Sequence, residues 1–112
     1  MRTRAGHAGM LAIAVAFPLA TTAEDVSDDE LCGRVSRAAE FVMEMRQEGR
    51  SLSDIMTGFA SDNPLLREMV LEAWATDPYV TEQGKQRAIA RFRDDWTLHC
   101  YLTHERTDRT EQ

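Results

Sequence analysis

Apolar side chains recur at helical spacing along most of the chain, and the clearest stretch runs from Leu31 to Met45. Within it the apolar residues follow one another at intervals of four, three, four and three, which places them on one stripe of an α-helix. The sequence Ser-Asp-Asp-Glu at 27–30 fits a capping box at the start of such a helix. Gly49 takes the left-handed conformation that often ends a helix without strain. These signals predict a first helix between Ser27 and Gly49.

Three further helices are expected in the rest of the chain. The second is short and lies just after the first. The third begins at Pro64, because proline is well tolerated at the first helical position, and it ends before Asp77-Pro78, because the residue ahead of a proline disfavours helical geometry. The fourth is expected from Thr81 to near His104, and its apolar residues repeat at intervals of three, four and four: Ile89, Phe92, Trp96 and Cys100.

The pattern favours helices throughout. No stretch of the sequence alternates apolar and polar residues as a half-buried strand would, and β-branched residues do not cluster. The expected fold is therefore all-α, a small bundle of about four helices. The polar residues from about 105 to 112 are expected to form a frayed tail.

The first 23 residues have the features of an export signal. Arginines at positions 2 and 4 supply a positive start, an apolar run covers 10–19, and Thr-Thr-Ala precedes position 24. The run is about half of the roughly 20 apolar residues that a membrane-spanning helix needs. We therefore expect residues 1–23 to be a cleaved signal peptide and residues 24–112 to be a single periplasmic or secreted domain. An uncleaved membrane anchor is the alternative.

Cys32 and Cys100 are the two cysteines of the sequence. In a small exported domain such a pair is most economically explained as one disulfide. The bond would join the first and last helices, and it requires the two Cα atoms to lie within about 6 Å of one another. We therefore expect the two ends of the domain to meet in space.

The chain is acidic, with 13 Lys and Arg against 19 Asp and Glu and a net charge of −6. Removal of residues 1–23 takes away two arginines and brings the net charge to −8. This balance opposes binding to nucleic acid or to anionic lipid, because such binding depends on Lys and Arg neutralising phosphates. A solvated surface that keeps the protein dispersed is the main explanation of the acidity, and attraction to a cationic partner is the alternative.

His99, Cys100 and His104 form the one cluster in the sequence that resembles a set of metal ligands. A zinc or copper site normally needs three or four protein ligands, and an oxidised Cys100 offers no thiolate, so no metal site is expected. Asp95 lies four residues before His99 and would support a charged imidazole, which makes this pair a candidate pH sensor. An ordinary pair on a helix surface is the alternative.

The sequence carries no motif of an enzyme. It has neither a Gly-x-Ser-x-Gly elbow nor a Cys-x-x-Cys pair, and its serines and threonines mostly fit caps and turns. We expect no catalytic residue and no cofactor. Residues 74–79 are the expected contact surface, because Trp74 and Tyr79 flank a turn that Pro78 makes rigid. Alternatively, both rings simply close the end of the bundle.

The chain resembles the small two-cysteine helical proteins of unassigned role that many Gram-negative bacteria export. The resemblance rests on a methionine-rich first helix that runs into Met-Arg-Gln-x-Gly at 45–49, and on a cysteine near each end of the mature domain. It covers most of residues 32–101 and implies no particular activity. In size, cysteine count and acidity the domain is also similar to periplasmic acid-stress chaperones, whose disulfide-tied helical dimer loosens at low pH.

We expect a non-enzymatic periplasmic or secreted protein that binds an unknown protein partner through the apolar and aromatic surface left uncovered by the bundle. A pH-responsive chaperone is the alternative, because protonation of acidic groups below about pH 4 would leave the basic groups unbalanced and favour partial opening. A weak metal-binding protein that uses His99 and His104 is a second alternative.

Overall fold

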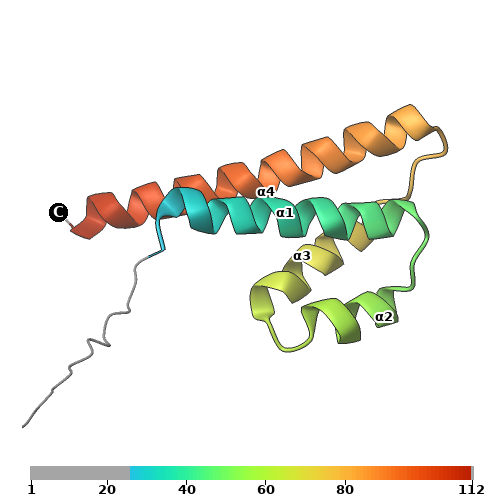
Figure 1. Ribbon diagram of the computed structural model, residues 1–112, viewed down its shortest axis with the longest axis horizontal. Helices are drawn as coiled ribbons and strands as arrows, with labels where there is room; N and C mark the ends of the chain where they lie inside the picture. Colours follow the sequence, from blue (N-terminus) through green and yellow to red (C-terminus); the bar gives the residue numbers. More distant parts are fainter. Residues whose placement is uncertain (1–25, 112) are drawn as a thin grey trace, which may run out of the picture.

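The computed structural model describes residues 26–111, except for the side chains at 108, 110 and 111. The expected signal peptide and its cleavage site lie outside the described residues. Within 26–111 the chain forms four α-helices, one of them continued by a π-helical segment, and no strand (Figure 1). The prediction of an all-α fold is confirmed.

Helix α1 (Asp28–Gln47) has the predicted ends. The Ser27 hydroxyl accepts a hydrogen bond from the backbone N–H of Glu30 at 3.1 Å, which is the first half of a capping box. The Glu30 carboxylate bonds to Arg34 at 3.1 Å. Gly49 follows the helix with φ of +80°, the left-handed conformation that glycine adopts without strain.

Helix α2 (Leu52–Ile55) is short and continues directly into the π-helical segment η2 (Met56–Ala60). The predicted second helix is thus present, but its widened second half was not predicted. Helix α3 (Pro64–Trp74) begins as expected, with proline in its first turn and with the Asn63 side chain accepting from the N–H of Leu66 at 3.0 Å.

Helix α4 (Glu82–Glu111) begins after Thr81, whose hydroxyl accepts from the N–H of Gly84 at 3.0 Å. The predicted end near His104 is wrong, because the helix continues to Glu111. Contacts along the helix support this polar extension. The Thr107 hydroxyl donates to the carbonyl of Thr103 at 3.0 Å, and Arg109 pairs with Glu105 at 3.9 Å. A helix therefore persists where the apolar stripe ends, and fraying of the tail stays a prediction.

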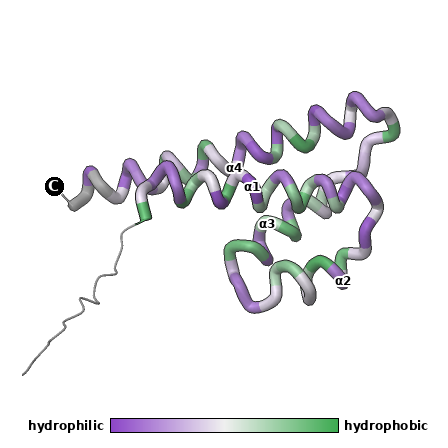
Figure 2. Tube along the Cα trace, in the orientation of Figure 1, coloured by the Kyte–Doolittle hydropathy of each residue, from purple (hydrophilic) through white to green (hydrophobic). Residues whose placement is uncertain are grey.

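Helix α1 is the centre of the fold. It runs antiparallel to α4 along one side and packs against α3 on another, whereas α3 and α4 make few contacts with each other (Figure 1). Apolar residues are most concentrated in α2 and α3, while α1 and α4 alternate between apolar and polar residues along each turn (Figure 2). The core is built from the facing stripes of α1, α3 and α4: Val35, Ala39, Val42, Met43, Met69, Val70, Ala73, Ile89, Phe92 and Trp96.

The disulfide closes the structure at the end where α1 begins. Cys32 in α1 and Cys100 in α4 are bonded, with their Cα atoms 5.7 Å apart. This confirms that the first and last helices are joined, although α4 continues for eleven residues beyond Cys100, so the C-terminal end of the described chain lies past the start of α1 (Figure 1). None of the helices within 26–111 combines the length and the apolar character needed to cross a membrane.

Candidate functional site

The predicted contact segment, residues 74–79, is fastened to the C-terminal end of α1. The Arg46 guanidinium lies 5.5 Å from the centre of the Trp74 ring and donates to the carbonyl of Thr76 at 2.8 Å. The side-chain oxygen of Gln47 accepts from the backbone N–H of Tyr79 at 2.9 Å. The turn is therefore held in place by α1 at both of its ends.

Gln47 is a positioning residue that the sequence did not reveal. It is 5% exposed, and its side-chain N–H donates to the Met43 sulfur at 3.3 Å. Its backbone carbonyl accepts from the Lys85 ammonium at 2.9 Å, so it also ties α1 to the first turns of α4. Its burial could have been predicted from its position, because it lies four residues after Met43 and therefore on the same face of the helix.

The two aromatic rings of this segment have different surroundings. Trp74 is partly buried beneath Arg46, as expected for a ring that closes the end of a helix. Tyr79 is 46% exposed, and its ring lies against Gly84 at the start of α4. Pro78 is exposed beside it. A role for Trp74, Pro78 and Tyr79 in contacting a partner stays a prediction.

An open groove begins at Tyr79 and lies between α3 and α4. Its first hollow has a volume of about 410 Å³. Buried or half-buried apolar side chains contribute to its lining: Met43, Ala88 and Phe92. Exposed charged side chains complete the lining from both helices: Glu72, Arg87, Arg91 and Asp95. The first hollow is therefore amphipathic.

Two smaller hollows of about 190 Å³ each continue the groove along α4. The nearer one shares Glu72 and Asp95 with the first and adds Glu68, Trp96 and His99. The farther one shares Trp96 and His99 with its neighbour and is mostly apolar, with a lining that includes Leu31, Val35, Leu65 and His104. The three hollows follow one another from Tyr79 to His104 and share lining residues, and we call this row of hollows the α3–α4 groove.

Trp96 lies where the two smaller hollows meet. Its side chain is 8% exposed, and its indole N–H has no hydrogen-bond partner among the described residues. A buried donor without an acceptor costs about 1–3 kcal/mol. Because the indole nitrogen is itself buried, other atoms of Trp96 form its part of the groove wall. The sequence predicted the burial of Trp96 but not its missing partner.

Asp95 and His99, the candidate pH-sensing pair, both line the middle hollow. Within the described part of the chain no ion pair joins them, and the His99 ring instead contacts the Trp96 ring edge-on, with centroids 6.1 Å apart. A pH-sensing role for this pair stays a prediction.

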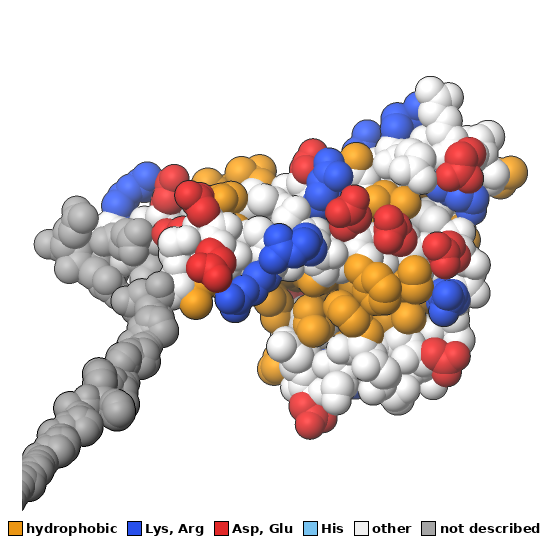
Figure 3. All heavy atoms as spheres, in the orientation of Figure 1, with side chains coloured by type: hydrophobic (Ala, Val, Ile, Leu, Met, Phe, Trp, Pro, Cys, Tyr) orange, Lys and Arg blue, Asp and Glu red, His pale blue; other side chains and the backbone are white. Residues whose placement is uncertain are grey.

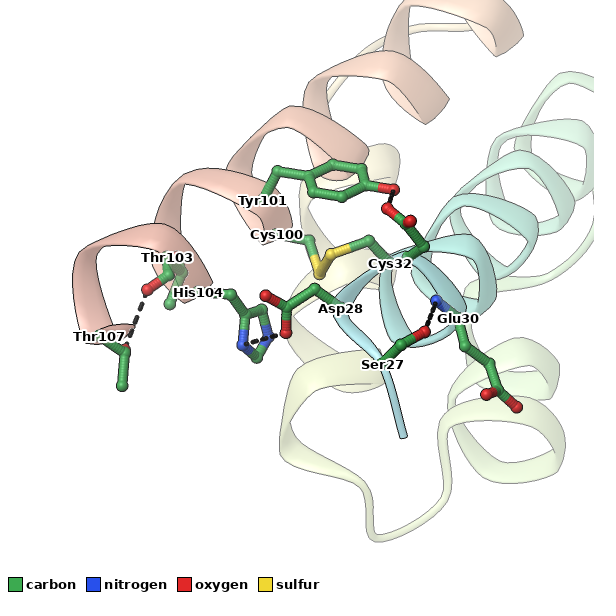
Figure 4. A network of polar contacts seen from close by, with 10 residues as sticks. Ser27, Asp28, Glu30, Cys32, Cys100, Tyr101, Thr103, His104 and Thr107 are labelled. Atoms are coloured by element: carbon green, nitrogen blue, oxygen red, sulfur yellow. Dashed lines mark hydrogen bonds and ion pairs between the residues drawn. A yellow bond between two sulfur atoms is a disulfide. The ribbon is translucent and has the colours of Figure 1, made fainter. Parts of the chain in front are cut away.

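A second cluster gathers around the disulfide, where the first turn of α1 meets α4 (Figure 4). His104 Nδ1 lies 3.7 Å from a carboxylate oxygen of Asp28, and the Tyr101 hydroxyl donates to Asp29 at 2.9 Å. Neither contact could be predicted from the sequence, because each joins residues more than 70 positions apart.

The Tyr101 contact has a consequence for stability at high pH. The hydrogen bond to Asp29, followed by desolvation and by the nearby carboxylate charges, raises the pKa of Tyr101 above its usual value of 10.0. The folded state therefore holds this proton more tightly than the unfolded chain. The resulting stabilisation is complete below pH 10 and is lost as the pH rises through the raised pKa.

We accordingly expect the free energy of unfolding to fall more steeply above pH 10 in the native protein than in a Tyr101→Phe variant. Urea unfolding at several pH values between 8 and 11 measures the two slopes. Equal slopes would show that the phenol titrates alike in the folded and unfolded states.

A further apolar area lies on another part of the surface. Figure 3 shows apolar side chains gathered over α1 and the α2–η2 segment. Between the same two elements, the ring of Phe41 in α1 contacts the ring of Phe59 in η2, with centroids 4.9 Å apart. We call this area the Phe41–Phe59 face. Its two rings already cover one another, so it provides a comparison surface for the groove.

Comparisons of the chain with known protein families, with curated proteins and with solved structures find no match. The description of the protein therefore rests on its own fold and candidate site. It is a disulfide-closed all-α domain with an amphipathic groove between two helices, α3 and α4, which both pack on α1.

Proposed function

We propose that the protein is a non-enzymatic binding protein of the periplasm or the extracellular space, and that it holds a helical segment of a partner protein in the α3–α4 groove. The observation that carries the proposal is an open, partly apolar groove between α3 and α4, with Trp96 in its wall. The Cys32–Cys100 disulfide is consistent with an oxidising compartment.

The arrangement of the helices favours a helix as the occupant. Helices α3 and α4 each pack on α1 and make few contacts with one another. A helix of the partner that entered the groove would therefore lie against both walls. Amphipathic helices bind in grooves of this kind through an apolar face. The apolar residues Met43, Ala88 and Phe92 would receive that face.

Charge indicates the polar face of the partner. Three carboxylates line the middle of the groove, from Glu68, Glu72 and Asp95, and the whole chain has a net charge of −6. Carboxylates placed in this way favour lysine or arginine on the partner and speed its approach. The expected partner is therefore a basic amphipathic helix.

Capture of the tagged mature protein from its own cell envelope at pH 7 is the first test, followed by affinity measurements with the partner helix as a synthetic peptide. Asp95→Lys reverses a charge inside the groove, and we expect it to weaken binding at least about tenfold, as the loss of one close charge pair does. Asp94→Lys is the matched control, because Asp94 is exposed, does not line the groove and pairs only with its neighbour Arg93.

Equal losses of affinity in the Asp94 and Asp95 variants would contradict the groove as the binding site. Trp96→Phe makes the aromatic ring in the wall of the groove smaller, so we expect weaker binding with unchanged helicity. Loss of binding in a Phe41→Ser variant alone would assign the partner to the Phe41–Phe59 face. Binding of unfolded proteins only below about pH 4 would instead support the acid-stress chaperone alternative.

A further inference from the structure

The cluster at the disulfide contains three metal-binding side chains. The sulfur atoms of Cys32 and Cys100 and one imidazole nitrogen of His104 all lie within 4.8 Å of one another. Both cysteines are buried, and the His104 side chain is 33% exposed. Cys100 and His104 are one turn apart on α4, so a single helix face presents two of the three groups. While the disulfide is intact, its sulfurs are not thiolates and do not bind a metal in this way.

We propose that reduction of the disulfide converts this cluster into a Zn²⁺ site with Cys32, Cys100 and His104 as its protein ligands. Zn²⁺ is commonly bound by cysteine and histidine in a tetrahedral arrangement, with a water in the fourth position where three protein ligands are present. Zn–S bonds of about 2.3 Å at tetrahedral angles place two sulfurs about 3.8 Å apart. Once the sulfur–sulfur bond is open, rotation of the two cysteine side chains would bring the donor atoms to that geometry.

The chemistry of the conversion balances with a dithiol as the reductant. The dithiol supplies two electrons and two protons, so the Cys32–Cys100 bond breaks to give two thiols and the reductant becomes a disulfide. Zinc then displaces the two thiol protons, which pass to water, and the metal is held by two thiolates and a neutral imidazole.

Two further contacts support the site after the sulfur–sulfur bond has opened. The Asp28 carboxylate lies 3.7 Å from His104 Nδ1, and with a small approach it would orient the imidazole, as carboxylates commonly do beside metal-bound histidines. The hydrogen bond from Tyr101 to Asp29 joins the same two helices without any sulfur. Asp28 and Asp29 also place negative charge beside the proposed cation. Asp28 and Tyr101 are thus positioning residues for the site.

The test uses the mature protein reduced with dithiothreitol, freed of the reductant without oxygen and titrated with Co²⁺ as a spectroscopic substitute for zinc. We expect one Co²⁺ per chain, with thiolate-to-cobalt charge-transfer bands that disappear when Zn²⁺ is added. The oxidised protein should show neither. Absence of these bands in the reduced protein, or two chains per metal ion, would overturn the proposal.

Two histidine variants separate a specific site from general thiol binding. His104→Ala should weaken Co²⁺ binding at least about tenfold, since a ligand contributes no less than the group that orients it. His99→Ala is the matched control on the same helix and should bind Co²⁺ like the native sequence. Asp28→Asn should weaken binding roughly tenfold.

Circular dichroism of each reduced variant shows whether it is folded before the titration. If reduced His104→Ala is unfolded, the native sequence is compared in its reduced and oxidised forms instead. Zn²⁺ should raise the urea midpoint of the reduced protein but not of the oxidised one. Equal effects of Zn²⁺ on both redox forms, or equal losses of affinity in the two histidine variants, would overturn the site.

Discussion

Replacement of Cys32 and Cys100 by serine is expected to lower the free energy of unfolding by about 4 kcal/mol. The disulfide joins residues 68 positions apart, so it encloses most of the described chain and removes a large part of the freedom of the unfolded state. Domains of this size have little stability beyond this amount, because their cores are small. The loss should therefore bring the free energy of unfolding close to zero at room temperature.

Urea unfolding followed by far-UV circular dichroism measures this effect. The native sequence reduced with dithiothreitol in the absence of metal is the control, and it should show the same loss as the double serine variant. An unchanged urea midpoint in both would mean that the contacts of Asp28 and Asp29 with α4 hold the helix ends together without the covalent bond.

The second large effect is expected at Met69. This side chain is fully buried and is one of the largest in the core, where α3 packs on α1. Met69→Ala removes its apolar contacts and leaves a cavity that a well-packed interior fills only in part, at a cost of about 3 kcal/mol.

Leu71→Ala is the matched control for this prediction. Leu71 lies on the same helix but is 52% exposed, so its truncation should change the free energy of unfolding by less than about 0.5 kcal/mol. Urea unfolding of both variants provides the comparison. Similar losses would indicate that the outer face of α3 is covered in solution, by a partner or by a second copy of the chain.

The helices were predictable because their signals are local. Ser27, Pro64 and Thr81 each act within one helical turn, and all three lie at the helix starts where the sequence placed them. The end of α4 was not predictable from the apolar stripe, because polar contacts along the helix support its last turns. The π-helical segment η2 also has no simple sequence signal.

The candidate sites were predictable only in part. Tyr79, Asp95 and His99 were recognised as candidates, and all three line the α3–α4 groove. Their common location depends on where α3 packs on α1, which no local pattern specifies. The contact of Asp28 with His104 could not be predicted either, because it joins two helices that lie far apart in the sequence and meet only in the folded protein.

The two walls of the α3–α4 groove are attached to α1 in different ways, so they should differ in stiffness. Helix α4 is anchored to α1 near its start, through Lys85 and Gln47, and again at Cys100, through the disulfide. Among the described residues, the polar links from α1 to α3 lie at the C-terminal end of α3, where Arg46 reaches the carbonyls of Trp74 and of Thr76 just beyond it. We therefore expect α4 to be the rigid wall of the groove and α3 the more mobile one. Partner helices of different diameter would then be accommodated by displacement of α3, the helix that the disulfide does not restrain.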